Sequence, residues 1–321
     1  MPEEHPVLVS RDRRRAGRGT DRRGFLRLLA GGAALAGCSH HHAPLTCEQT
    51  TPGHEIPRLP DFDREVLTFG PLTDRTVVLL HELPGMYPST LGLARCLARQ
   101  GMTVYLPLLF GTVEQESGFL GYFQACWSRD FSCGKTDTTS EGVKQVSTLC
   151  DEARKRSGQS VGVIGMCLTG AFPLALLGNN ANVTAAVLCQ PALPFSALRG
   201  RPTKKQAKDL GISAADARAA RESRVPFLAL RFLDDDISPE RRMQALEERF
   251  QEQIATIRLQ GTHDDDHSTL AGSFDPVAFE DTVAYVKVRL GLEAGPTEMK
   301  LAKLNGASCL IGADGRWHAK R

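Results

Sequence analysis

The feature that most constrains this chain is a series of short apolar runs separated by segments with helical spacing. The runs are rich in β-branched residues and poor in polar ones, so each predicts a strand that is buried on both faces. They lie at residues 75–81, 102–106, 161–164, 184–188, 226–232 and 254–259. Helical patterns lie at residues 90–99, 140–157, 168–177 and 275–290. Strands that alternate with helices predict an α/β fold with a mostly parallel central sheet and helices on both faces.

The predicted folded domain covers residues 59–291. Residues 200–222 depart from its alternation, because they are helical, basic and rich in alanine and stand between two predicted strands. We interpret them as an insertion over the edge of the sheet that helps to shape a site. Residues 292–321 carry no strong pattern, so we treat them as a C-terminal extension without an assigned structure.

The net charge of +2 is distributed unevenly along the chain. Residues 1–27 hold eight arginines against four acidic residues, and the uncharged residues 28–36 that follow are too few to span a bilayer. A basic segment ahead of a short apolar one is typical of an export signal. Within it, the segment Arg22-Arg23-Gly24-Phe25-Leu26-Arg27 is similar to the twin-arginine export motif.

The end of this signal, Leu35-Ala36-Gly37-Cys38, resembles a bacterial lipobox, in which cleavage exposes a cysteine that carries lipid. We therefore predict an export signal at residues 1–37, a lipid on Cys38 that contacts the membrane, and a polar linker over residues 38–58. The protein would then be an exported, membrane-anchored lipoprotein of the cell envelope. The alternative is a disordered basic tail with a chance match, and the protein would then be cytoplasmic.

Composition argues against two other classes of protein, nucleic-acid-binding and membrane-spanning ones. A net charge near zero gives no electrostatic footprint for nucleic acid, so we expect no nucleic-acid partner. The sequence has no run of about eighteen apolar residues, so we expect no transmembrane helix. The sequence does not indicate an oligomeric state.

Nine cysteines raise the question of disulfides. In an oxidising compartment, Cys126 and Cys133 are a candidate pair because they lie close together in the sequence. Cys96, Cys150 and Cys189 lie in apolar periodic runs, and we interpret them as buried thiols.

Residues 165–170 read Gly-Met-Cys-Leu-Thr-Gly and stand where a predicted strand gives way to a helix. This is the nucleophile-elbow pattern, with cysteine in place of serine. The turn is tight, so the residues two positions from the nucleophile must be small. Gly165 meets this requirement, whereas Thr169 is larger than the usual glycine, and Gly170 follows it. The thiol of Cys167 would stand at a helix N-terminus, where the dipole favours a thiolate and backbone N–H groups face an oxyanion.

An acid and a base follow in chain order. Three aspartates, residues 234–236, come at the end of the predicted strand 226–232, where carboxylates reach the edge of the sheet, but the pattern alone does not choose among them. His263 and His267 follow the last predicted strand. They stand in a polar loop rather than on a helix, and the histidines at residues 40–42 lack a second ligand cluster, so we expect no metal. The order nucleophile, acid, histidine is that of α/β-hydrolases.

A family resemblance rests on four places in the chain. Glu82 follows the first strand, Cys167 lies in its glycine-flanked motif, an aspartate stands four residues before Pro239, and His267 precedes Ser-Thr-Leu. Together these resemble the dienelactone hydrolase family, over about residues 75–290. The resemblance implies an α/β-hydrolase fold without a cofactor. In that family a cysteine replaces the serine of the triad, and a glutamate beside it governs whether the thiol is ionised.

The resemblance implies four side chains of the site: Cys167 as nucleophile, His267 as base, Asp235 as the residue that orients it, and Glu82 as partner of the thiol. The choice of Asp235 rests on the family's Asp-x-x-x-Pro spacing, which Pro239 supplies. Leu83 and Leu168 would donate backbone N–H groups to the oxyanion. We therefore expect hydrolysis of a small-molecule ester or enol-lactone through a thioester.

Two features depart from the family pattern. Thr169 stands where many members have glycine, and residues 126–131 have no counterpart in compact members. Within that segment, Arg129 either pairs with a substrate carboxylate or is a surface arginine. The alternative to catalysis is an exported lipoprotein that uses the fold to bind a ligand or a protein partner. A thiol-redox role for Cys167 is a further alternative, but no CxxC motif supports it.

Overall fold

The computed structural model describes the chain in several ranges: residues 54–55, 62, 64–83, 85–111, 113, 139–192, 208–263, 266–291, 298–299, 309–311 and 317–319. The predicted export signal, its lipidation site Cys38, the pair Cys126 and Cys133, and Arg129 lie outside the described residues. These remain predictions.

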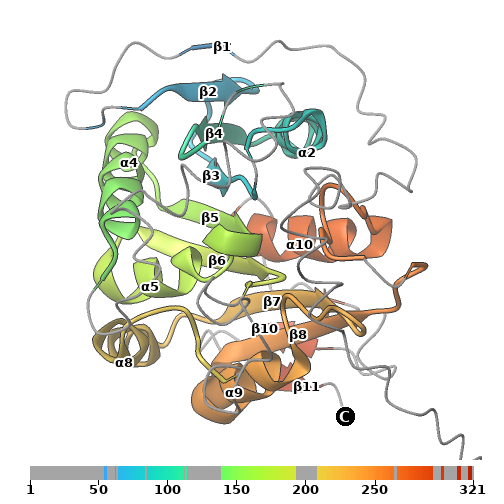
Figure 1. The fold of residues 1–321 in the computed structure, drawn as a ribbon. Helices are drawn as coiled ribbons and strands as arrows, with labels where there is room; N and C mark the ends of the chain where they lie inside the picture. The colour runs from blue at the N-terminus through green and yellow to red at the C-terminus, as the bar shows by residue number, and fades with distance from the viewer. Residues whose placement is uncertain are drawn as a thin grey trace, which may run out of the picture.

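An eight-stranded sheet forms the centre of the domain (Figure 1). Its strands, in spatial order, are β1 (His54–Glu55), β2 (Val66–Phe69), β4 (Thr103–Pro107), β3 (Thr76–Leu80), β5 (Val161–Met166), β6 (Val183–Cys189), β7 (Phe227–Phe232) and β8 (Ile254–Leu259). The pairs β1–β2 and β2–β4 are antiparallel, and all the following pairs are parallel. The predicted parallel sheet is confirmed, and the antiparallel edge formed by β1 and β2 is an addition to it.

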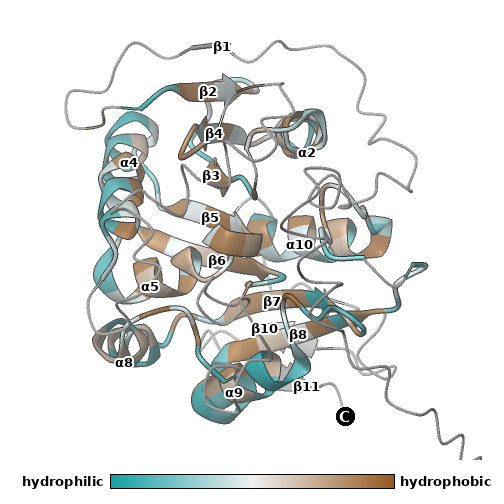
Figure 2. Ribbon diagram, in the orientation of Figure 1, coloured by the Kyte–Doolittle hydropathy of each residue, from teal (hydrophilic) through white to brown (hydrophobic). Residues whose placement is uncertain are grey.

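Helices cover both faces of this sheet (Figure 1). They are α2 (Pro88–Arg99), α4 (Glu141–Ser157), α5 (Phe172–Asn179), α8 (Ala214–Ser223), α9 (Glu240–Phe250) and α10 (Pro276–Arg289). Along β3, Val77 and Leu79 pack with α2 and α10, whereas Val78 and Leu80 pack with the helices of the other face. Strands buried on both faces explain why their sequences read as continuous apolar runs, which Figure 2 shows in brown.

Capping residues set the ends of the helices close to where the sequence places them. The Oγ of Ser140 accepts a hydrogen bond from Val143 N at 3.3 Å, and Gly158, whose φ is +71°, caps the C-terminal end of α4. Asp275 caps α10 in the same way, accepting from Ala278 N at 2.9 Å. Both predicted helices are thus confirmed to within a residue or two at each end.

The helix after Cys167 begins later than expected. Residues Cys167–Thr169 form a single 3₁₀ turn, η2, and α5 begins only at Phe172. Pro173 explains the break, because proline has no N–H for a helical hydrogen bond and fits only the first turn of a helix.

The interpretation of residues 200–222 as an insertion over the sheet edge is wrong for the part that the structure describes. Within it, α8 packs against α5 and is the crossover helix between β6 and β7. The two helices approach closely because Gly178 faces two alanines. A Cβ at Gly178 would lie 2.5 Å from Ala220 N and 2.7 Å from Ala219 Cβ.

Three of the cysteines described with their side chains keep free thiols. Cys150 and Cys189 are buried, as expected, and burial raises the pKa of both thiols. Cys96, although also buried, is disulfide-bonded, which corrects the expectation of a free thiol there.

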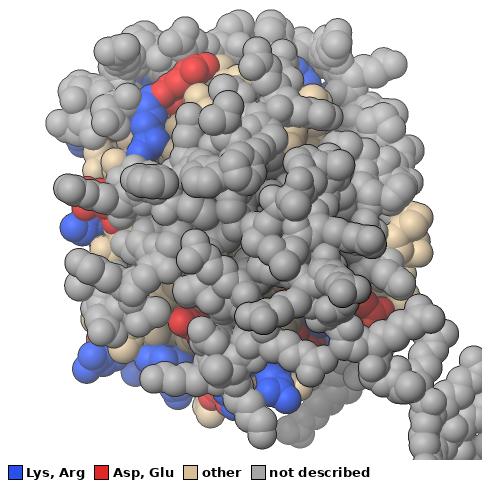
Figure 3. Space-filling model, in the orientation of Figure 1, with Lys and Arg blue, Asp and Glu red and all other residues tan. Residues whose placement is uncertain are grey.

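The surface and the C-terminal residues complete the description. Figure 3 shows described Lys and Arg side chains beside Asp and Glu along the margins of one face. None of the described helices combines the length and the apolar character needed to cross a membrane. Near the C-terminus, β9 (Glu298–Met299), β10 (Cys309–Ile311) and β11 (Trp317–Ala319) form a separate antiparallel sheet of three strands.

A buried histidine connects the ends of β3 and β4. Leu109 N donates to Nε2 of His81 at 3.0 Å, so the other nitrogen, Nδ1, carries the proton and donates to the carbonyl of Glu82 at 3.1 Å. The ring also stacks edge-on against Phe110, with centroids 4.4 Å apart. Burial lowers the pKa of His81 to about 4. The neutral ring therefore fixes the backbone next to Glu82.

We predict that this histidine makes the fold sensitive to acid. Between the pKa of about 6.5 in the unfolded chain and about 4 in the folded one, only the unfolded chain binds the proton, so stability falls as the pH falls. The loss over this window should be roughly 3 kcal/mol, from about 1.4 kcal/mol per pKa unit. Urea unfolding at several pH values should show a shallower dependence for His81→Gln. The exposed His263 is the control, and a His81→Gln slope equal to those of wild type and His263→Gln would contradict the prediction.

Candidate active site

Polar side chains gather at the carboxyl edge of the sheet. They are Glu82 after β3, Cys167 after β5, Gln190 after β6, Asp235 after β7 and His267 after β8. The carboxyl ends of parallel strands meet at one edge, which is where open α/β sheets bind their ligands. The sheet therefore brings together residues that are far apart in the sequence.

Cys167 has an uncommon backbone conformation. Its φ is +53°, in the left-handed region that non-glycine residues rarely adopt, at a cost of about 1–3 kcal/mol. Two backbone N–H groups, those of Gly170 and Ala192, each donate to the Cys167 carbonyl at 2.9 Å. Packing leaves no room for larger neighbours, because a Cβ at Gly165 would lie 2.3 Å from Thr169 O. A Cβ at Gly170 would lie 2.7 Å from the Cα of Pro191.

Thr169, which departs from the family pattern, makes hydrogen bonds within the turn and to the neighbouring strand. Its side chain is fully buried, and its Oγ1 accepts a hydrogen bond from Met166 N at 3.1 Å. Three carbonyls lie within reach of the hydroxyl proton: that of Met166 in the same turn, at 3.0 Å, and those of His81, at 3.2 Å, and Leu80, at 3.3 Å, at the end of β3. The close approach that we expected at position 169 occurs at Gly170 instead, and the threonine hydroxyl bridges the turn to the end of β3.

His267 and Asp235 form a buried pair. The Nδ1 of His267 lies 2.7 Å from Oδ2 of Asp235, and both residues are buried. The other carboxylate oxygen of Asp235 accepts from Ile237 N at 2.9 Å and from Ser238 N at 3.0 Å. The strand pattern alone could not choose among the three aspartates, and the family resemblance favoured Asp235. Of the three, the structure buries only Asp235, since Asp234 and Asp236 are exposed.

The environment of His267 favours its charged form. Burial alone would lower the pKa, but the charges of Asp235 and Cys167, together with the hydrogen bond to Asp235, raise the pKa of His267 well above its ordinary value. Within the described part of the chain, the buried Nε2 has no hydrogen-bond partner, although the charge of Cys167 is near enough to act on the imidazole. This electrostatic environment supports a protonated imidazole at His267, next to Cys167 and Asp235.

The buried carboxylate of Glu82 accepts two side-chain hydrogen bonds whose direction is fixed. Ser268 Oγ accepts from Gly272 N at 2.7 Å, so its own proton points to Oε1 of Glu82. The Oε1 of Gln190 accepts from the hydroxyl of Thr269 at 2.6 Å and from its N–H at 3.2 Å. The amide nitrogen of Gln190 therefore faces Oε2 of Glu82, at 3.2 Å.

Ser268 and Gln190 each accept a hydrogen bond from a backbone N–H group, which can only donate. Both side chains therefore turn a donor toward Glu82, and each oxygen of Glu82 acts as an acceptor. Such a pattern favours the ionised carboxylate. The sequence reasoning missed Gln190 and gave Ser268 no role. The signal available in the sequence was the position of Gln190, a polar residue directly after a buried strand. In the structure its φ of +33° also marks an unusual turn.

Leu83 and Leu168, the two residues that the resemblance places at the oxyanion, follow neighbouring strands. Strands β3 and β5 are parallel partners, with Leu80 opposite Gly165, so the two turns lie side by side. Both leucine side chains pack partly buried against the same apolar cluster. This placement fits the expectation for their backbone N–H groups, and the role itself stays a prediction.

The two histidines of the 261–270 loop do not converge on a metal site. His263 is exposed and its Nδ1 lies 2.9 Å from its neighbour Thr262 Oγ1, whereas His267 is buried with Asp235. Among the residues whose placement is described, no group of three or more His, Cys, Asp or Glu side chains could hold a metal ion.

Comparison with solved structures supports the fold. An esterase from Pyrococcus furiosus matches with a TM-score of 0.53 and 14% identity, over 78% of this chain and 97% of the esterase. Brefeldin A esterase, a bacterial homologue of human hormone-sensitive lipase, matches with a TM-score of 0.52 and 15% identity, over 84% of this chain and 86% of that one. At these identities the likeness shows the α/β-hydrolase fold alone.

Comparison of sequences identifies the family. No curated protein matches the chain significantly. The sequence model of the dienelactone hydrolase family, however, matches residues 66–283, which is most of the chain and includes every residue of the candidate site at the carboxyl edge of the sheet. The protein thus belongs to the dienelactone hydrolase family and is a hydrolase with the α/β-hydrolase fold.

Proposed function

We propose that this hydrolase cleaves a small ester or enol-lactone, with Cys167 as nucleophile, His267 as base and Asp235 as the residue that orients the base. The observation that carries the proposal is the buried His267–Asp235 pair beside a Cys167 whose backbone is held at a φ of +53°. A strained, glycine-flanked turn of this kind presents a nucleophile at the edge of an α/β-hydrolase sheet.

The proposed reaction has two steps. In the first, the Cys167 thiolate attacks the carbonyl carbon, the C–O bond of the ester breaks, and the imidazolium of His267 protonates the leaving oxygen. In the second, neutral His267 removes a proton from water, the resulting hydroxide attacks the thioester, and the thiolate leaves. The N–H groups of Leu83 and Leu168 stabilise the oxyanion in both steps.

Glu82 would act on the state of the thiol. Its carboxylate lies at the same edge of the sheet, buried and directed by Ser268 and Gln190. As an acceptor, it can take a proton from the Cys167 thiol and so govern whether the thiol is ionised, which is the role that the family resemblance implies for it. A thiolate nucleophile suits esters and enol-lactones, because their leaving groups are good. Arg129 would bind a carboxylate on such a substrate.

We predict that Cys167→Ala loses at least about a thousandfold in hydrolysis of p-nitrophenyl acetate or an enol-lactone, because no thioester can form. Steady-state kinetics would measure the loss, and circular dichroism would show that the fold is kept. Cys150→Ala is the matched control, since it removes a buried thiol of α4 far from the turn. Equal activity of Cys167→Ala and wild type would rule out the nucleophile. Binding without turnover by wild type would favour the non-catalytic lipoprotein.

We also propose that the protein is exported and anchored by a lipid on Cys38. The support is the signal-like composition of residues 1–37, and the disulfide at Cys96 fits an oxidising compartment.

For export we predict that full-length protein, expressed in a bacterium, fractionates with membranes and begins at a lipid-modified Cys38. Mass spectrometry of the membrane fraction would identify the modified N-terminus. Cys38→Ala should leave the membrane fraction, whereas Cys47→Ala, nine residues further along, is the control that should stay in it. Recovery of soluble wild-type protein with its intact N-terminus from Met1 would contradict the proposal.

A further inference from the structure

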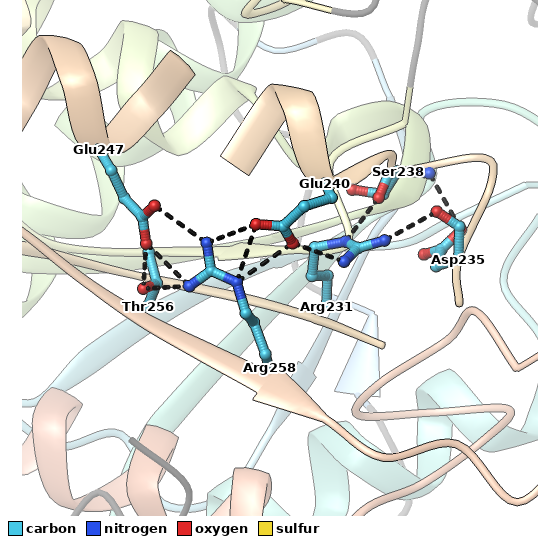
Figure 4. Close-up of polar contacts among 7 residues, drawn as sticks. All are labelled: Arg231, Asp235, Ser238, Glu240, Glu247, Thr256 and Arg258. Carbon is cyan, nitrogen blue, oxygen red and sulfur yellow. Dashed lines mark hydrogen bonds and ion pairs between the residues drawn. The ribbon is translucent and has the colours of Figure 1, made fainter. Parts of the chain in front are cut away.

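A buried arginine stands behind the aspartate of the candidate triad. Arg231 lies on β7, and its side chain is 2% exposed. Its guanidinium donates from Nε to the carbonyl of Ser238 at 2.7 Å and from Nη2 to the carbonyl of Asp235 at 3.0 Å. The remaining nitrogen, Nη1, pairs with Glu240 at 2.8 Å (Figure 4). All three nitrogens of the guanidinium therefore have a partner.

The two carbonyls bound by Arg231 are the ends of the turn that holds the Asp235 carboxylate. On the inner side of the turn, Ile237 N and Ser238 N donate to Oδ1 of Asp235. On its outer side, the guanidinium joins the carbonyls of Asp235 and Ser238. Rotation of this turn would move Oδ2 away from Nδ1 of His267, at present 2.7 Å away.

Arg231 is itself held by a chain of ion pairs (Figure 4). Arg231 and Arg258 stand directly opposite each other on β7 and β8, where two like charges would repel. Glu240, at the start of α9, lies between them and also binds Arg258 at 2.8 Å. Arg258 in turn binds Glu247 at 2.8 Å. Without Glu240, the strands would carry two adjacent arginines, one of them buried.

We propose that Arg231, clamped by Glu240, is a positioning residue that sets the orientation of Asp235 and, through it, of His267. The inference rests on the proposed function, because it gives Arg231 a purpose only if Asp235 and His267 serve Cys167. A purely structural role predicts the same loss of stability on substitution, but no change at the thiol. The two roles can therefore be separated by an experiment that observes Cys167.

The readout is the pH dependence of alkylation of Cys167 by iodoacetamide, followed by mass spectrometry of its peptide. An imidazolium at His267 stabilises the thiolate, and Asp235 stabilises the imidazolium, so a loosened Asp235 moves the onset of alkylation to higher pH. Among the described residues, Asp235 from the loop after β7 contacts His267, and Arg231 lies behind Asp235. Glu82, from the loop after β3, binds Ser268, the neighbour of His267.

For Arg231→Met we expect kcat/KM for p-nitrophenyl acetate to fall by about tenfold or more, since small displacements of catalytic groups cost large factors in rate. The onset of alkylation should move up by about half a pH unit or more, as the charge–charge contact that stabilises the imidazolium weakens. Arg231→Lys keeps the charge and can make some of the bonds, so it should lie between Arg231→Met and wild type. Glu240→Gln should shift the onset in the same direction by less.

Arg289→Met is the matched control. Arg289 on α10 donates from Nε to the carbonyl of Thr184 at 2.9 Å, which is the same kind of bond at a place that does not touch the site. This variant should lower the melting temperature and keep the wild-type onset. If the Arg231 and Glu240 variants behave in the same way, the positioning role is wrong. If Arg231→Met does not fold, Arg231→Lys and Glu240→Gln decide the question.

The same measurement on wild type separates this inference from the proposed function. A wild-type Cys167 that is alkylated no faster at neutral pH than a simple thiol, in a protein that hydrolyses no ester, overturns the triad itself. Fast alkylation and ester turnover in wild type, with unchanged onsets in the Arg231 and Glu240 variants, overturn only the role of Arg231.

Discussion

The left-handed turn at Cys167 is the constraint on which the rest of the site depends. Its strain is tolerated because the carbonyl of Cys167 accepts two backbone hydrogen bonds and because glycines at positions 165 and 170 allow the strands and the helix to meet closely. Thr169 then fastens the turn to the end of β3, next to Glu82. The position of the thiol is therefore set by packing across three neighbouring strands, β3, β5 and β6, rather than by the loop alone.

Around that turn, the buried carboxylates are oriented by backbone N–H groups, which can only donate hydrogen bonds. Backbone N–H groups point at Asp235, and others reach Glu82 through Ser268 and Gln190. A backbone N–H can only donate, so it determines which side-chain atoms donate and which accept along the whole chain of contacts. His81 is an example of the opposite outcome, since burial without a carboxylate partner lowers its pKa to about 4 and keeps it neutral. Two buried histidines of one protein thus acquire opposite charge preferences from their partners.

The sequence predicted the parts of this structure that follow from local periodicity and from strand ends. Apolar runs located the parallel strands, and the order of Cys167, the aspartates and His267 indicated three positions of the candidate site. It did not reveal that α8 is a crossover helix. The packing of α8 depends on the absence of a side chain at Gly178 of α5, which leaves room for two alanines of a segment distant in the sequence. Nor did it reveal Gln190 or Arg231, whose contacts join residues that only the sheet brings together. Periodicity alone does not distinguish the three adjacent aspartates; the family spacing to Pro239 favours Asp235, which is also the one of the three that is buried.

The ion pairs behind the site also have an energetic meaning. Removing a cation from water is expensive, and a buried pair rarely returns more stability than well-packed apolar residues would. Burial lowers the pKa of Arg231 for this reason, although Asp235 and Glu240 counteract the effect. An apolar residue at position 231 would fill the same space in an otherwise apolar strand, but it could not bind two carbonyls of one turn at once. The geometry that the guanidinium imposes on Asp235, rather than a gain in stability, is what accounts for a buried charged side chain near the carboxyl end of β7.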